Sequence, residues 1–193
     1  MNQKKYAILI LAAGNSSRLG RPKQLVKFGD GNLLSHTIDV VSSIPNADVH
    51  IILGAFSKEI LDEINTCYPI QINPNWKKGM GNTIAFGVNQ VKDSKYDAVI
   101  LSVCDQPYLE PIHFEQLIQS YENASQKNII VSKYESGNGP PSLFCAQYLD
   151  QLCSLEGDHG AKSIVKKNLE KVGFIDFKRG DVDVDKKEDL LLF

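Results

Sequence analysis

Three features are scarce or missing in this sequence, and each absence excludes a class of protein. No stretch of the 193 residues approaches the roughly 20 apolar residues of a membrane span, so we expect no membrane partner. The net charge of -2 does not suit a general nucleic-acid surface, which needs a concentrated basic face. The cysteines show no CxxC spacing, which argues against a zinc knuckle or a disulfide framework and favours a cytoplasmic location.

Two common phosphate-binding loops are missing as well. From Gly14 the chain runs GNSSRLGRPK, which fits neither the P-loop spacing nor a GxGxxG fingerprint. A different loop, LAAGNSSRLGRPK over residues 11–23, follows directly on the apolar run 6–11. Such a short, continuous run is typical of a strand buried on both faces. The loop is therefore expected at the carboxyl end of a central strand, where open α/β sheets bind ligands, and its glycines, hydroxyls and cations suit a polyphosphate.

Alternating strand and helix patterns predict an α/β fold. Apolar residues have helical spacing at 33–43, 58–65, 82–91 and 111–121, and short apolar runs typical of strands lie at 6–11, 49–53, 70–72, 98–103 and 129–132. This order predicts a Rossmann-like three-layer sandwich, with a mostly parallel central sheet and helices on both faces. Residues 1–193 are expected to form a single domain. The glycine- and proline-rich stretch 136–141 is expected to be a loop or short insertion.

An aspartate follows the second fully apolar run. Asp105 comes directly after residues 98–103 and is followed by Gln106 and Pro107, which indicate a sharp turn. A carboxylate at the carboxyl edge of a strand suits Mg²⁺, which prefers carboxylates together with substrate phosphates. Asp105 could equally cap the following helix. The residue alone does not decide between a metal site and a helix cap.

A third segment, NPNWKKGMGNT over residues 73–83, has glycines at the start of a predicted helix. N–H groups exposed at such an end bind anions. Gly79, Gly81 and Asn82 are therefore candidates for nucleotide binding. Trp76 is expected to plug the loop against the sheet rather than to stack on a base.

The loop at 11–23 resembles the signature LAAGxSxRxGxxK of the MobA-like nucleotidyltransferases, a family that joins a nucleotide to a phosphorylated acceptor and includes the molybdenum cofactor cytidylyltransferases. Residues 105–107 resemble the DQP-type metal-binding motif of that family, and residues 73–83 its nucleotide-contacting segment NPxWxxGMGxS. The resemblance implies a nucleotide-diphospho-sugar transferase-like fold. It assigns the catalytic residues Arg18, Lys23 and Asp105. It implies nucleotide binding by Leu11, Ala12, Ala13, Gly14, Ser16, Lys23, Gly79, Gly81 and Asn82.

Residues 183–190, DVDKKEDL, resemble the DIDTPEDL ending of the family, which implies that Asp183 joins Asp105 as a metal ligand. Lys187 stands where proline is usual, so the start of a helix is less firmly specified. A solvated acidic segment without metal is the alternative. Carboxylates spaced by two along an extended segment face the same side, so one carboxylate could complete a metal site while the others face water.

Two further segments resemble acceptor-binding motifs but depart from them. In residues 157–162, GDHGAK resembles GDxGAR, with Lys162 in place of an arginine, which keeps the charge but loses the bidentate fork. In residues 139–144, GPPSLF falls where the family has GHPxLF, so Pro140 replaces a histidine. The acceptor is therefore the least specified part of the prediction.

The resemblance implies Mg²⁺-dependent transfer of CMP from CTP to a phosphate-ended acceptor, molybdopterin, with release of pyrophosphate. It also implies transient contact with a molybdoenzyme or chaperone. A phosphate monoester with a second pKa of about 6 is largely dianionic at neutral pH, so the acceptor needs no general base. In the family LAAG accompanies cytidylyl transfer and LAGG guanylyl transfer, and the Ala13 methyl is expected to fill room that a purine needs. GTP as donor, a sugar phosphate or methylerythritol phosphate as acceptor, a glycosyltransferase, and a non-catalytic nucleotide-binding regulator stay open.

Overall fold

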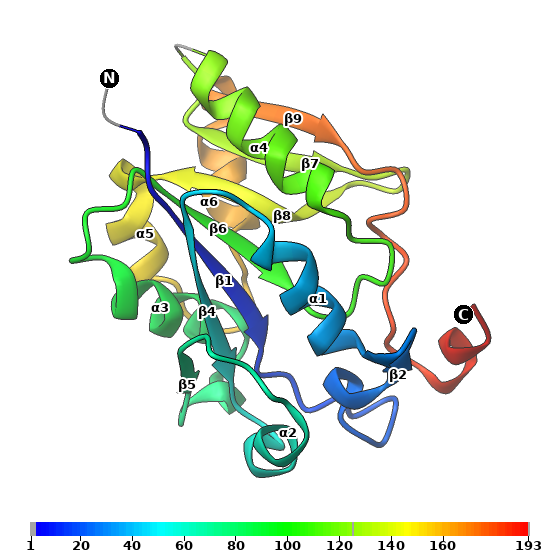
Figure 1. The fold of residues 1–193 in the computed structure, drawn as a ribbon. Coiled ribbons are helices and arrows are strands. Elements are labelled where there is room, and N and C mark those ends of the chain that lie inside the picture. The colour runs from blue at the N-terminus through cyan, green and yellow to red at the C-terminus, as the bar shows by residue number, and fades with distance from the viewer. Residues whose placement is uncertain (1–2, 125, 193) are drawn as a thin grey trace.

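The computed structural model describes residues 3–124 and 126–192. The described strands form a seven-stranded sheet in the spatial order β5 (Ile70–Ile72), β4 (Ala47–Leu53), β1 (Tyr6–Ala12), β6 (Ala98–Val103), β8 (Asn138–Cys145), β7 (Ile129–Lys133) and β9 (Val172–Asp176). The helices are α1 (Leu33–Ser42), α2 (Ser57–Glu63), α3 (Met80–Val91), α4 (Pro111–Asn123), α5 (Leu149–Cys153) and α6 (Lys162–Lys167), and a small hairpin joins β2 (Lys27–Phe28) to β3 (Gly31–Asn32). Figure 1 shows the sheet running through the middle of the molecule.

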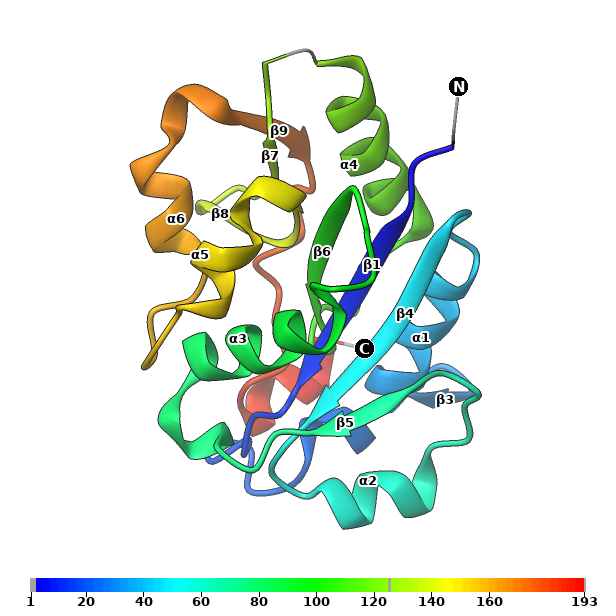
Figure 2. The same ribbon diagram turned by 90° about the vertical axis from the view of Figure 1, so that its left-hand side faces the viewer.

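Helices cover both faces of the sheet, as the sequence pattern predicts. Along β1, Ile8 and Ile10 belong to one buried cluster together with residues of α1 and α4, and Leu9 belongs to another together with residues of α3, α5 and α6. This split follows from the alternation of side chains along a strand. Figure 2 shows α3, α5 and α6 on one side of the sheet and α1 and α4 on the other. The fold is therefore the three-layer α/β sandwich expected from the sequence.

The carboxyl ends of four parallel strands lie along one edge of the sheet. β1 pairs in parallel with both β4 and β6, and β4 pairs in parallel with β5. Leu11 is in register with Val103, so the loops after β1 and β6 leave the sheet side by side. β8 is antiparallel to β6, which brings its first residues to the same edge. The motif at 11–23, Asp105 and the start of β8 thus meet.

One sequence prediction on the fold is wrong. The sequence predicts a loop or short insertion at 136–141, but the last four residues of this stretch begin strand β8. The register between β7 and β8 shifts between Val131 and Ser132, so that Pro140 and Pro141 fall within an irregularity of the ladder. Proline is tolerated at such a place because it has no N–H to donate. The Pro141 carbonyl still accepts a bond of 2.7 Å from the Ser132 hydroxyl.

Candidate active site

One buried glutamine, Gln24, holds the loop after β1 in place through hydrogen bonds. The Nε2 group of Gln24 donates to the carbonyl oxygen of Ala12 at 2.7 Å and to that of Gly14 at 3.2 Å. Ser16 has a positive φ of 49° and its carbonyl accepts the amides of Leu19 and Gly20. The Ser16 hydroxyl accepts the Lys23 amide at 3.0 Å. These bonds fix the loop that carries Arg18 and Lys23.

Gly14 has no conformational need to be glycine. Its φ is not positive, and a Cβ built on it would have nothing within 4 Å. The residue is exposed and lines a cavity. The missing side chain therefore leaves open space directly above the loop, which suits a bound group that approaches the backbone closely.

The Ala12 side chain faces the opposite side of the sheet from the cavity that Leu11 and Ala13 line. Its side chain is 2% exposed and packs into the buried cluster on the α1 and α4 side of the sheet. Ala13 and Leu11 line the cavity on the other side. Ala12 can therefore contribute to a nucleotide site through its backbone only, and Leu11 and Ala13 through their side chains.

Lys23 and Asp105 form the centre of a charged cluster. The Lys23 ammonium donates to Oδ2 of Asp105, and it lies 3.0 Å from Oδ1 of Asp185. Burial of Lys23 lowers its pKa, but the charge and hydrogen bond of Asp105 and the charge of Asp185 outweigh burial, so the net pKa is raised and Lys23 is protonated. The Arg18 guanidinium joins the cluster through Asp185 at 2.6 Å. The three residues predicted to be catalytic thus lie together.

The acidic segment after β9 is held against Asp105 by its backbone. The Val184 amide donates a 3.0 Å bond to the Asp105 carbonyl, and the fully buried Val184 side chain packs in a cluster with Leu19, Val26 and Leu33. Val184 separates Asp183 from Asp185, so both carboxylates flank this anchor. The Asp181 carboxylate instead accepts the Ser136 amide at 3.0 Å.

Asp105 and Asp183 are near enough to influence each other electrostatically, which makes them the candidate ligands for a divalent cation. Partial burial raises the pKa of Asp183 to about 7, with further contributions from the negative charges of Asp105 and Asp185. The residue as a whole is exposed although its carboxylate is partly desolvated. Solvent therefore screens part of the repulsion, and the direction of the pKa shift favours a compensating positive charge. Oδ1 of Asp105 is buried and has no hydrogen-bond partner among the described residues.

The pair would not complete a coordination shell by itself. Within the described part of the chain, no group of three or more His, Cys, Asp or Glu side chains is placed to hold a metal ion. Mg²⁺ is usually bound by one or two carboxylates together with waters and substrate phosphates. A two-carboxylate site therefore fits Mg²⁺ bound together with a nucleotide.

The glycines before α3 hold a loop in place. Gly79 has a positive φ of 104°, and a Cβ there would come within 2.5 Å of the Gly157 backbone. The Gly81 amide donates to the Gly157 carbonyl at 2.8 Å, and the Asn82 side chain accepts the Gly157 amide at 3.0 Å. The Gly79 amide is also bonded, to the Trp76 carbonyl. Both N–H groups therefore have partners within the described part of the chain, while Gly79 also lines a cavity. Nucleotide binding by Gly79, Gly81 and Asn82 stays a prediction.

A cavity of about 310 Å³ lies between the loop after β1 and the start of α3. Ala13 and Gly14 line it on one side, and Trp76 and Lys77 on the other. Trp76 also packs against the backbone just after β4, because a Cβ on Gly54 would lie 2.6 Å from its Cβ. We call this space the loop cavity.

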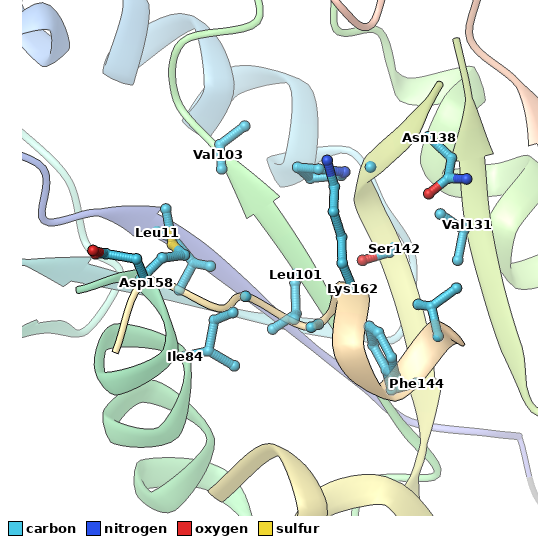
Figure 3. A pocket seen from close by; sticks show the side chains of 16 residues that line it. Leu11, Ile84, Leu101, Val103, Val131, Asn138, Ser142, Phe144, Asp158 and Lys162 are labelled. Atoms are coloured by element: carbon cyan, nitrogen blue, oxygen red, sulfur yellow. The ribbon is translucent and has the colours of Figure 1, made fainter. Parts of the chain in front are cut away.

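A second cavity, of about 290 Å³, opens beside the first. We call it the β8 cavity, and Figure 3 shows the side chains that surround it. Its floor is apolar and includes Ile84, Leu101 and Phe144, whereas Asn138 and Lys162 bring polar groups. Both segments with resemblance to acceptor motifs, 139–144 and 157–162, contribute to its lining. The two cavities share Leu11, Met80 and Asp158.

Sequence reasoning missed two residues that hold this site together. The side chain of Gln106 is 2% exposed. Its Nε2 donates to the Gly180 carbonyl at 2.6 Å and to the Pro140 carbonyl at 3.1 Å, which ties the acidic segment and β8 to the end of β6. Asp185 was part of a recognised acidic run, but no local pattern distinguished it from Asp183. Its contact with Lys23 spans 162 positions.

Comparison with known proteins identifies the family. The model of the MobA-like NTP transferase domain matches residues 8–172, which include the loop after β1, Asp105 and both cavities. The chain belongs to the MobA-like NTP transferase family. It is therefore a nucleotidyltransferase, as the resemblance of the loop implied.

Relatives in this family differ in their named activities. The chain is 24% identical over 167 residues to the purine catabolism protein PucB of Bacillus subtilis, which covers 82% of this chain and 79% of PucB. It is 29% identical over 120 residues to a probable molybdenum cofactor guanylyltransferase of Bacillus thuringiensis, covering 62% of this chain and 58% of that protein. It is 23% identical over 135 residues to the 2-C-methyl-D-erythritol 4-phosphate cytidylyltransferase of Neisseria meningitidis, covering 66% and 59%.

Solved structures show the same fold. The crystal structure of Rv0371c from Mycobacterium tuberculosis superposes with a TM-score of 0.87 at 25% identity and covers 100% of both chains. Another structure of Rv0371c is a complex with manganese, with a TM-score of 0.82 at 22% identity, covering 98% of this chain and 97% of that one. In the described part of this chain, no helix is both long and apolar enough to cross a membrane.

Proposed function

We propose that this nucleotidyltransferase uses Mg²⁺ to transfer CMP from CTP to molybdopterin or a similar phosphate-ended acceptor, releasing pyrophosphate. The observation that carries the proposal is the pair of adjoining cavities, which share Leu11, Met80 and Asp158. Together they are lined by the ends of β1 and β6, the two strands that lead into the loop with Lys23 and to Asp105. A transfer between two substrates needs two neighbouring sites, because holding both reactants in one geometry removes much of the entropic barrier.

The loop cavity suits the nucleoside of the donor. Gly14 leaves space for a group close to the backbone, and Trp76 supplies an aromatic wall. The phosphates would follow the loop toward Arg18, Arg21 and Lys23. Arg18 is 62% exposed and is paired with Asp185, but a guanidinium has five N–H donors, so it has capacity for further anions.

Asp105 and Asp183 would hold the metal ion. The unpartnered, buried Oδ1 of Asp105 supports this choice. When bound, Mg²⁺ neutralises charge that develops on the departing pyrophosphate. The Lys23 ammonium donates to one of these carboxylates, Asp105, and is protonated, so it would stabilise the same charge.

The β8 cavity suits an acceptor with an organic ring and a phosphate. Its apolar floor would bury the ring, as pockets for small molecules usually do. Lys162 is a cation at its edge and would bind the phosphate. A dianionic phosphate is itself the nucleophile, so the chain need only orient it and exclude water.

GTP is the alternative donor. One relative is named a guanylyltransferase and another a cytidylyltransferase, so family membership alone leaves the base open. Ala13 favours CTP: it is 5% exposed, lines the loop cavity, and its Cβ lies 2.9 Å from where a Cβ on Gly54 would be. The methyl thus lies against Gly54, just after β4, and has little room to move away from a larger base.

Nucleotide binding tests the donor assignment first. Thermal unfolding is measured with CTP, GTP, ATP and UTP, each with Mg²⁺. A ligand at 100 times its Kd stabilises the folded protein by about 2.7 kcal/mol. We expect CTP to give the largest rise in melting temperature. A larger rise with GTP would favour guanylyl transfer, and no rise with any nucleotide would contradict the proposal.

A further inference from the structure

We propose that Asp185 sets the affinity of the site for polyphosphate, by binding the two cations that the phosphates of the donor must take over. The inference rests on the proposed function, because it assumes that Arg18 and Lys23 receive phosphate. It assigns Asp185 a role distinct from metal binding. The carboxylate would act as an internal competitor of the donor and as an aid to release of pyrophosphate.

Two of the three cations of the loop, Arg18 and Lys23, converge on this one carboxylate. Oδ2 of Asp185 lies 2.6 Å from the Arg18 guanidinium, and Oδ1 lies 3.0 Å from the Lys23 ammonium. Each oxygen therefore takes one cation. A phosphate group would likewise offer two anionic oxygens, one to an arginine and one to a lysine.

The carboxylate is held in this position by its own segment. Oδ2 of Asp189 accepts the Asp185 amide at 2.8 Å and the Lys186 amide at 2.7 Å. On the other side, Val184 is buried and bonded to the Asp105 carbonyl. Asp185 thus starts from a fixed backbone, and its side chain can leave the cations and return without refolding of the segment.

The contact is exposed enough to be exchanged. The side chain of Asp185 is 34% exposed and that of Arg18 is 62% exposed, and exposed ion pairs of this kind contribute little to stability. A triphosphate with its metal carries several charges and can displace one carboxylate. After transfer, the returning carboxylate competes with pyrophosphate for the same cations, which favours release of the product.

Titration with inorganic pyrophosphate tests the inference without depending on the base or the acceptor. Binding to wild type, Asp185→Asn and Asp181→Asn is measured by calorimetry, with and without Mg²⁺. Asp181→Asn is the matched control, because it removes the same charge from the same segment but its carboxylate bonds the Ser136 amide. Asp185→Ser serves as a second variant if the first does not fold.

We expect Asp185→Asn to bind pyrophosphate roughly five- to tenfold more tightly than wild type, on the scale of two partly exposed ion pairs, and Asp181→Asn to bind like wild type. In turnover, KM for the donor should fall and inhibition by pyrophosphate should strengthen. Equal or weaker binding by Asp185→Asn, or no pyrophosphate binding by any of the proteins, would overturn the inference. If Asp185→Asn binds pyrophosphate more weakly than wild type only when Mg²⁺ is present, Asp185 would instead be a metal ligand. Failure of the donor assignment alone would leave the pyrophosphate result unchanged.

Discussion

The Asp105 carbonyl accepts a 3.0 Å hydrogen bond from the Val184 amide, which joins the end of β6 to the acidic segment near the C-terminus. Asp183 and Asp185 lie on either side of Val184. One backbone bond thus brings three carboxylates toward Lys23. Within this cluster we assign Asp105 and Asp183 to the metal and Asp185 to the cations of the loop, and each assignment can be tested by a single substitution.

Asp105→Asn should keep the fold and lose most turnover. The amide is nearly isosteric, but it is a poor ligand for a hard cation. We expect pyrophosphate release to fall by about 100-fold or more, the scale of one preorganised electrostatic contact, while the melting temperature changes little because Lys23 keeps Asp185 as a partner. Near-normal turnover would remove Asp105 from the metal site.

Asp183→Asn should weaken stabilisation by Mg²⁺ without destabilising the metal-free protein. In wild type the Asp183 carboxylate is repelled by Asp105 and Asp185. Removing that charge should therefore leave the metal-free free energy of unfolding unchanged or raise it by about 0.5 kcal/mol, because the residue is exposed. Urea unfolding with EDTA and with Mg²⁺ plus CTP measures both effects. A clear loss of stability in EDTA would mean that Asp183 has a structural role.

Lys23→Ala should reduce both turnover and stability. The side chain of Lys23 is only 17% exposed and pairs with two carboxylates. Its removal leaves those carboxylates facing each other, which should cost about 2 kcal/mol of stability without metal and at least ~2 kcal/mol of transition-state stabilisation. Mg²⁺ should restore part of the stability but not the turnover. Wild-type turnover with reduced stability would limit Lys23 to a structural role.

Gly14→Ala and Gly79→Ala form a matched pair with opposite expected effects. A Cβ on Gly14 has nothing within 4 Å, whereas one on Gly79 meets the Gly157 backbone at 2.5 Å, at a φ of 104°. Gly14→Ala should therefore keep its melting temperature but bind CTP more weakly. Gly79→Ala should lower the free energy of unfolding by about 2 kcal/mol or more and therefore unfold at a lower temperature. If both variants changed stability and CTP binding to the same extent, Gly14 and Gly79 would not have the distinct roles proposed here.

Ala13→Gly should narrow the preference for CTP over GTP. Discrimination by a methyl-sized difference is worth about 1–3 kcal/mol, so the preference should be measurable but not absolute. Calorimetric titration of both nucleotides into both proteins, with Mg²⁺, gives the four affinities. Equal affinities in wild type, or a GTP preference that survives the substitution, would mean that the base is chosen elsewhere.

Local sequence patterns predicted most of the fold. The strands β1, β4, β5, β6 and β7 and the helices α1 to α4 lie where apolar periodicity indicates, with ends shifted by a few residues. Most of them carry a continuous run or a stripe of buried apolar residues. β8 was missed because Pro140 and Pro141 are usually read as a turn. Their strand position depends on Ser132 and Gln106, which bond the proline carbonyls from other elements.

The site was predictable in its parts but not in its connections. The motif containing Arg18 and Lys23 and the position of Asp105 follow from local sequence. The pairing of Lys23 with Asp185 does not, because it depends on how the segment after β9 crosses the edge of the sheet. The same holds for Gly79, whose positive φ could be anticipated but whose contact with Gly157 could not.

Transfer of labelled phosphate tests the central claim most directly. The protein is incubated with Mg²⁺, molybdopterin and CTP labelled at the α-phosphate, and in parallel with CTP labelled at the γ-phosphate. We predict that the α label appears on the acceptor and the γ label in pyrophosphate, in equal amounts, and that Asp105→Asn shows neither. If labelled GTP passes its α-phosphate to the acceptor and CTP does not, the donor is GTP. Release of pyrophosphate without labelled acceptor, or no release from any nucleoside triphosphate, would contradict nucleotidyl transfer to this acceptor.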